Sequence, residues 1–130
     1  MTQTANNRFF KSQRLLRHAD FERVYKQGRR HFAAHMTVFY LARAGEIADS
    51  SLGSRVGFTV SKALGGAVQR NRMKRRLREV VRLQGVPAGL NADIVINPKR
   101  TLLTAEFPDL RNEIAKAFVV IEKTLKKEKR

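Results

Sequence analysis

Apolar residues recur at helical spacing in three stretches of the chain. The first covers residues 16–26, ends at a glycine stop, Gly28, and carries Phe21, Val24 and Tyr25. The second covers about residues 67–84. The third begins near residue 104, with Pro108 tolerable only in its first turn, and its apolar stripe comprises Leu110, Ile114, Phe118, Ile121 and Leu125. The pattern predicts three amphipathic helices.

Three other stretches have the residue types of β-strands. Residues 29–43 are strand-like, and their alternation sets Met36, Val38 and Tyr40 on one face against Thr37, Phe39 and Leu41. Residues 55–61 are β-branched and aromatic, and residues 92–97 form a short apolar run stopped by a proline. Small, polar residues at 44–54 indicate a loop. Helices and strands that alternate in this way predict an α/β fold.

The length and composition indicate one domain. A chain of 130 residues, 42% of them hydrophobic, closes a single core without disulfides or metals. Residues 15–127 form the predicted domain, and residues 128–130 form a basic tail. Residues 1–14 lack periodicity and are predicted to be a flexible arm whose basic residues can touch phosphate: Arg8, Lys11 and Arg14.

The charge balance points to a polyanionic partner. Lysine and arginine number 27 against 11 acidic residues, which gives a net charge of +16. Such a domain repels itself, and a nucleic acid relieves the repulsion while its condensed counterions are released. A membrane surface would require a broad lipid-facing apolar stripe opposite the charges, and no segment shows one. Neither a membrane partner nor a small-molecule substrate is therefore expected.

The absence of cysteine excludes disulfides, thiolate zinc sites and cysteine nucleophiles. The first twenty residues contain no apolar run long enough for a secretory signal, and no later run approaches a membrane span. We therefore expect a cytoplasmic protein.

Residues 70–82, RNRMKRRLREVVR, hold seven basic residues and a single acid. In helical projection the four apolar residues fall within an arc of about 100°, the width of a core-facing stripe: Met73, Leu77, Val80 and Val81. The remaining circumference is mostly basic, through Arg72, Lys74, Arg75, Arg76, Arg78 and Arg82. The projection predicts an anchored helix with a guanidinium-rich wall suited to folded RNA. The alternative, a solvated face, would interleave acids at i,i+4 spacing, which this segment does not.

The start of this helix has separate features. Arg70 projects beside the apolar stripe, so it must reach past the helix end or pair locally. Asn71 both donates and accepts hydrogen bonds, which favours a specific geometry over plain electrostatics. Before the helix, Lys62, Gly65 and Gly66 form a short loop in which glycine lets the backbone approach a phosphate. The loop is not a Walker motif, because no lysine follows the second glycine.

Aromatic residues supply the other half of a single-stranded RNA site, because bases stack on them. Three candidates are present, Phe21, Tyr25 and Phe39. Each could instead pack in the core, as phenylalanine at helical or alternating spacing usually does. Tyr25 is the strongest candidate, since its polar tip lies near Lys26, Arg29 and Arg30 in the sequence.

A nuclease that cleaves RNA with its own side chains is a further alternative. The three histidines, His18, His31 and His35, have no spacing that places a pair across a phosphate. The acidic residues form no DxD or ExD cluster for a two-metal site. We therefore expect no catalytic residue and no protein-held metal in this polypeptide.

Two motifs resemble a known family. The run RVGFTVSK at residues 55–62, followed by a glycine loop and RNRMKRRLRE at residues 70–79, closely resembles the signature of the bacterial ribonuclease P protein component. The resemblance extends more weakly to Arg14 and Leu15 before the first helix, and to the order of the remaining elements. Ala63 and Gly66 depart from it, at positions where the family often has lysine and asparagine.

The resemblance implies an α/β (α+β) two-layer sandwich of order α-β-β-β-α-β-α. It resembles the second domain of a small-subunit ribosomal protein and contains a left-handed βαβ crossover, against the general handedness rule. It implies that the basic helix and its preceding loop face the catalytic RNA subunit, and the residues that match the family's helix motif are Arg70, Asn71, Arg72, Lys74, Arg75 and Arg78. We expect Lys62 of the loop, and Arg76, which the projection places on the basic wall, to bind the same RNA. It also implies a cleft for the single-stranded 5′ leader of precursor tRNA, formed by Arg14, Phe21, Tyr25 and Phe39.

The resemblance further implies a non-catalytic cofactor of the ribonucleoprotein that removes the leader from precursor tRNA. Hydrolysis would depend on Mg²⁺ bound by the RNA subunit and the substrate, with no metal held by the protein alone. The main alternative is a general RNA-binding or ribosome-associated protein of the same fold, which would be indifferent to a leader. The aromatic residues favour the first interpretation, since a purely structural binder has no need of an aromatic cleft beside a basic helix.

Overall fold

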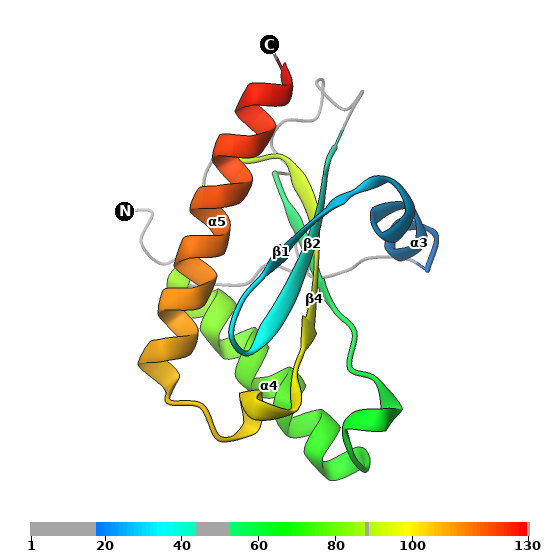
Figure 1. Cartoon of the computed structure of the whole chain (residues 1–130), viewed down its shortest axis with the longest axis vertical. Helices are drawn as coiled ribbons and strands as arrows, with labels where there is room; N and C mark the ends of the chain where they lie inside the picture. The colour runs from blue at the N-terminus through cyan, green and yellow to red at the C-terminus, as the bar shows by residue number, and fades with distance from the viewer. Residues whose placement is uncertain (1–17, 44–52, 88, 130) are drawn as a thin grey trace.

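The computed structural model describes residues 18–43, 53–87 and 89–129. Within these residues, three α-helices lie around one sheet (Figure 1). In chain order the regular elements are α3 (His18–Gln27), β1 (Arg29–Phe32), β2 (Met36–Ala42), β3 (Arg55–Phe58), α4 (Ala67–Gln84), β4 (Ala92–Pro98) and α5 (Phe107–Lys129). Two 3₁₀ turns, η2 (Lys62–Leu64) and η3 (Arg100–Leu103), precede α4 and α5. The predicted order α-β-β-β-α-β-α is therefore confirmed.

The four strands form one mixed sheet in the order β1-β2-β4-β3. β1 pairs with β2, and β2 with β4, in antiparallel fashion, whereas β3 and β4 are parallel. A parallel neighbour needs a crossover connection, and α4 supplies it between β3 and β4. In the register, Phe39 lies opposite both Arg30 and Val95, so these three side chains share one face of the sheet.

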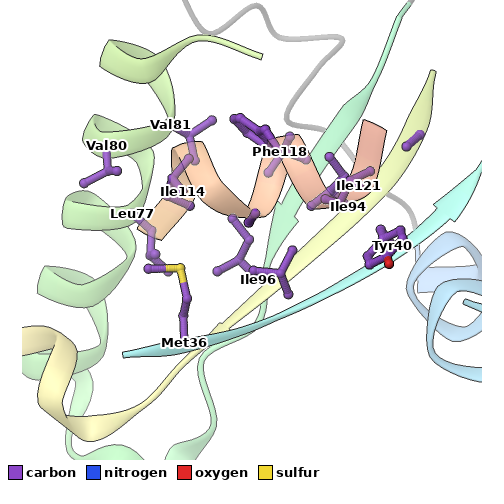
Figure 2. Close-up of a cluster of buried hydrophobic side chains, with 14 of the residues drawn as sticks. Met36, Tyr40, Leu77, Val80, Val81, Ile94, Ile96, Ile114, Phe118 and Ile121 are labelled. Carbon is purple, nitrogen blue, oxygen red and sulfur yellow. The ribbon is translucent and has the colours of Figure 1, made fainter. Parts of the chain in front are cut away.

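The main core lies between the sheet and the pair α4 and α5. The buried alternate residues of β2 and β4, such as Val38 and Ile96, meet the apolar stripes of both helices. Figure 2 shows residues of this cluster, among them Leu77, Val80 and Val81 from α4 and Ile114, Phe118 and Ile121 from α5. The predicted stripe of α4 (Met73, Leu77, Val80 and Val81) is buried in full. This burial fixes α4, and therefore fixes which of its side chains face outward.

α3 packs on the opposite face of the sheet, where it contacts β2 and β4 (Figure 1). Val24, a residue of α3, is fully buried. Gly28 ends the helix, as predicted, and its N–H donates to the carbonyl of Val24 at 2.8 Å. A Cβ at Gly28 would lie 2.5 Å from the carbonyl oxygens of both Tyr40 and Val24. Only glycine allows α3 to turn into β1 this close to β2.

Several predicted boundaries shift. The strand-like residues 29–43 are a hairpin of two strands with a short turn at residues 33–35. The strand predicted at 55–61 ends at Phe58, although the N–H of Thr59 still donates to the carbonyl of Ile96 at 3.1 Å. Pro108 lies in the first turn of α5, where its missing N–H costs no helical hydrogen bond. The predicted arm at residues 1–14 lies outside the described residues.

Candidate nucleic-acid interface

The outward face of α4 carries a row of polar and basic side chains. Asn71, Arg72, Arg75 and Arg78 follow one another at spacings of one, three and three residues, and all four are exposed. We call these four residues the outer row. Among the described residues, the side chains of the outer row and of the half-buried Lys74 make no hydrogen bond or ion pair. The outer row therefore presents three guanidinium groups and one amide to a partner from a helix that the core holds in place.

The other arginines of α4 have partners inside the protein. Arg70 donates from Nε to the carbonyl of Gly65 at 3.1 Å, the local pairing that its position in the projection predicts. Arg76 reaches the loop before α5, where its two terminal nitrogens donate to the carbonyls of Leu103 (3.1 Å) and Ala105 (2.6 Å). Arg82 forms an ion pair with Glu79, one turn before it. RNA contact by Arg76 stays a prediction from the helical projection.

The loop before α4 is closed by its own hydrogen bonds. The N–H of Gly65 donates to the carbonyl of Lys62 at 3.3 Å, and the N–H of Gly66 donates to Oε1 of Gln69 at 3.2 Å. Gly65 has φ of 147°, a conformation that favours glycine. These backbone donors are occupied, so the feature of this loop best suited to bind phosphate is the exposed side chain of Lys62.

On the other face of the sheet the predicted aromatic residues come together. The rings of Tyr25 and Phe39 meet edge to face with centroids 4.9 Å apart. The Tyr25 hydroxyl donates to Oδ1 of Asn97 at 3.1 Å, and 39% of the residue is exposed. Phe21 lies one helical turn before Tyr25 and is half-buried. We call Phe21, Tyr25 and Phe39 the aromatic surface; Arg14, predicted to join it, lies outside the described residues.

Two residues of β1 extend this surface: Arg30, which the sequence indicated only as a basic neighbour of Tyr25, and Phe32, which the sequence analysis did not select. The guanidinium carbon of Arg30 lies 5.9 Å from the ring centroid of Phe39 and 5.6 Å from that of Phe32. Both distances are within cation–π range. Phe32 is 66% exposed although it is a large apolar residue. The alternation of arginine and phenylalanine in RRHF was the available sequence signal, because residues two apart on a strand share a face.

An ion cluster attaches α3 to the sheet beside the aromatic surface. Asp93 of β4 is 1% exposed, and Arg55 of β3 binds both of its carboxylate oxygens at 2.8 Å. Arg23 of α3 donates to the same carboxylate at 2.8 Å, and Asp20 lies 3.4 Å from Arg55. Hydrogen bonding to Asp93 raises the pKa of Arg55 despite partial burial, so its guanidinium remains charged at any physiological pH.

Arg43 completes the cluster, with its Nε 3.8 Å from a carboxylate oxygen of Asp93. It also donates to the carbonyl of Gly53 at 2.6 Å. We call Asp20, Arg23, Arg43, Arg55 and Asp93 the ion cluster. These arginines add to the positive charge of the chain, but their position makes them fold-stabilising residues.

The histidines are not assembled into a site. His18 lies 3.3 Å from Glu22 on α3, whereas His35 lies at the β1–β2 turn and contacts Thr101 (2.8 Å) and Glu113 (3.5 Å). Within residues 18–43, 53–87 and 89–129, no three His, Cys, Asp or Glu residues are grouped to hold a metal ion. In the same residues no helix is long and apolar enough to span a membrane.

Comparison with known proteins supplies the remaining observation. The family model described as Ribonuclease P matches residues 9–122. This chain belongs to the ribonuclease P protein family. The ribonuclease P protein component of a Geobacter species is 38% identical to it over 115 residues, which cover 88% of this chain and 92% of the relative. That of Finegoldia magna is 34% identical over 104 residues, with 80% and 86% of the two chains covered.

Solved ribonuclease P proteins share the fold. The Staphylococcus aureus protein superposes with a TM-score of 0.67 and 29% identity, over 85% of this chain and 95% of that one. The Thermotoga maritima protein gives a TM-score of 0.65 and 27% identity, over 81% and 94%. The mixed α+β fold implied by the family motifs is therefore confirmed. In this ribonuclease P protein the outer row and the aromatic surface lie on opposite sides of the sheet layer, because α4 and α3 cover opposite faces.

Proposed function

We propose that this chain is the accessory protein subunit of a ribonuclease P ribonucleoprotein that removes the 5′ leader of precursor tRNA. The observation that carries the proposal is the outer row of α4, whose three arginines have no partner among the described residues and stand on a helix held by its buried stripe. Guanidinium groups bind phosphate oxygens in bidentate fashion, and their prior ordering on a helix lowers the entropy lost on binding. The outer row is thus assigned to the RNA subunit.

The opposite face is assigned to the leader. Single-stranded bases stack on exposed aromatic rings, and the partly exposed ring of Tyr25, backed by Phe39, offers such a platform. The side chain of Asn97 accepts a hydrogen bond from the Tyr25 hydroxyl, and this bond orients the ring. With RNA-binding groups on both sides of its sheet, the protein would bridge the RNA subunit and the leader of the substrate.

The hydrolysis that removes the leader is assigned to the RNA subunit. Mg²⁺ takes oxygen ligands, chiefly carboxylates, phosphates and water, whereas arginine and lysine side chains are donors only. The outer row has no carboxylate and a single side-chain oxygen, the amide oxygen of Asn71, which is too little for a magnesium site, so the metal ions would be bound by the RNA subunit and the substrate. The protein would contribute affinity and would act in the cytoplasm.

The proposal is tested by the binding of leader-bearing precursor tRNA and mature tRNA to the holoenzyme. The reconstituted wild type should bind the precursor more tightly, and Tyr25→Ala should remove about five- to a hundredfold of that preference, the contribution of one stacked base. Tyr25→Phe keeps the ring and should retain most of the preference. Equal affinity of the wild type for both tRNAs would contradict leader binding and favour a general RNA-binding protein.

A further inference from the structure

The aromatic surface continues past Tyr25 to the edge of the sheet. Arg30 lies opposite Phe39 in the β1–β2 register, and its guanidinium is within cation–π distance of Phe39 and Phe32. Tyr25, Phe39, Arg30 and Phe32 therefore form a continuous series of π and guanidinium groups on one face. β1 is an edge strand, so among residues 18–43, 53–87 and 89–129 no further strand lies beyond this series.

Phe32 is not used by the core. Among the aromatic residues that the structure describes, Phe32 has the largest exposure, 66%, and it belongs neither to the main core nor to the residues packed against it. An exposed phenylalanine taken singly needs no explanation. Phe32 is not isolated, however, because the Arg30 guanidinium lies between its ring and the ring of Phe39, within cation–π distance of both.

We propose that Arg30 and Phe32 form a second base-stacking position for the single-stranded leader, beyond the one at Tyr25 and Phe39. This inference rests on the proposed leader binding and adds the number of nucleotides bound: the surface accommodates at least two leader nucleotides. RNA bases stack on aromatic rings and also on arginine guanidinium planes, so each member of the series is a platform of the required kind.

Charge complementarity favours RNA over a protein partner for this strip. Lys26 at the end of α3 is exposed and lies four positions before Arg30, so two basic residues accompany the strip, whereas the side chain of Arg29 lies on the other face of β1, opposite Tyr40. An aromatic strip flanked by cations provides stacking for bases and screening for the phosphates between them. A protein partner would instead require acidic groups to match these charges.

The test is the affinity of the reconstituted holoenzyme for precursors whose leader is lengthened by one nucleotide at a time from a leaderless transcript. In the wild type, affinity should rise over at least two added nucleotides before it levels off. Phe32→Ala should remove about tenfold of the gain from the longer leaders and leave the shortest leaders unaffected. Phe32→Tyr preserves the ring and should behave as the wild type, and Arg30→Lys, which keeps the charge but loses the planar group, should resemble Phe32→Ala.

Tyr25→Ala distinguishes the two proposals, because it should lower affinity at every leader length. If Phe32→Ala follows the wild type at all lengths while Tyr25→Ala does not, the second position is wrong and leader binding stands. If neither variant changes the leader dependence, leader binding by the aromatic surface is wrong. An equal loss for leaderless tRNA in Phe32→Ala would place Phe32 against the tRNA body and overturn the inference. Because Phe32 is exposed, its substitution should leave the fold intact, and a thermal unfolding curve for each variant checks this.

Discussion

Arg55 and Asp93 are joined by two parallel hydrogen bonds, each 2.8 Å long, across the neighbouring strands β3 and β4. The same carboxylate receives Arg23 from α3, so one buried acid joins a sheet edge to the helix that carries Tyr25. The ion cluster therefore positions the aromatic surface without belonging to it. The cluster contains more arginines than aspartates, so loss of either aspartate would leave guanidinium charge without a counter-ion.

Asp93→Asn should destabilise the fold by about 3 kcal/mol, because loss of one partner leaves buried charge uncompensated. This value is at the lower end of the usual range, since the side chain of Arg23 is 42% exposed and can turn to water. The measurement is chemical unfolding at a salt concentration that screens the +16 charge. Glu22→Gln is the control, because it removes the same charge from an exposed site on α3. Equal stability of the two variants would refute the role of the cluster.

Gly28→Ala should cost about 1–3 kcal/mol, because the added Cβ would overlap two carbonyl oxygens that cannot move independently of β2 and α3. Gly66→Ala is the control, since there the nearest atom, at 3.3 Å, is the flexible end of Gln69. Urea titration of both variants measures the difference. A Gly28→Ala protein as stable as Gly66→Ala would show that the α3–β1 turn relaxes at no cost.

Arg75 and Arg76 are neighbours in the sequence with different predicted roles. Arg76→Ala should lower the free energy of unfolding by about 1.5–3 kcal/mol, the range for hydrogen bonds from a charged group, because two carbonyls lose their donor. Arg75→Ala removes the same charge from an exposed position and should leave stability within about 0.5 kcal/mol. Thermal unfolding of the two proteins compares them directly, and a larger loss for Arg75→Ala would reverse the assignment.

Arg72→Ala combined with Arg75→Ala should weaken assembly with the RNA subunit at unchanged stability. Each lost phosphate contact should also lower the slope of log affinity against log salt by about 1. Binding titrations over a salt series give both quantities. Lys116→Ala with Lys123→Ala is the matched control, because it removes two exposed charges from α5. If the two double variants weaken assembly equally, the outer row has no special role and binding depends on total charge.

The regular part of the fold was predictable where the sequence contains its own boundaries. α4 begins and ends where predicted, because glycines precede it, Gly85 follows it, and one stripe of four apolar residues sets its rotation. The division of residues 29–43 into a hairpin could not be predicted, because the turn at residues 33–35 lacks the glycine, proline or asparagine that usually marks a turn. Local chemistry therefore predicts an element only when both of its ends carry a signal.

The ion cluster and the role of Arg76 could not be predicted. Asp93 reads as one polar residue in an apolar run, and its partners Arg23 and Arg55 are 70 and 38 positions away. Arg76 projects onto the basic side of α4, but the carbonyls that it binds belong to the segment before α5. Sequence patterns identify which residues are charged; only the fold shows which of these charges find partners within the protein.

The central claim is that this protein assists a catalytic RNA. It is tested by a cleavage assay that combines the purified protein, a bacterial ribonuclease P RNA and a leader-bearing precursor tRNA at low magnesium and physiological salt, together with assays that omit each component. Cleavage at the mature 5′ end should occur only when the protein and the RNA are both present. Cleavage by the protein alone, or no stimulation by the protein, would contradict it.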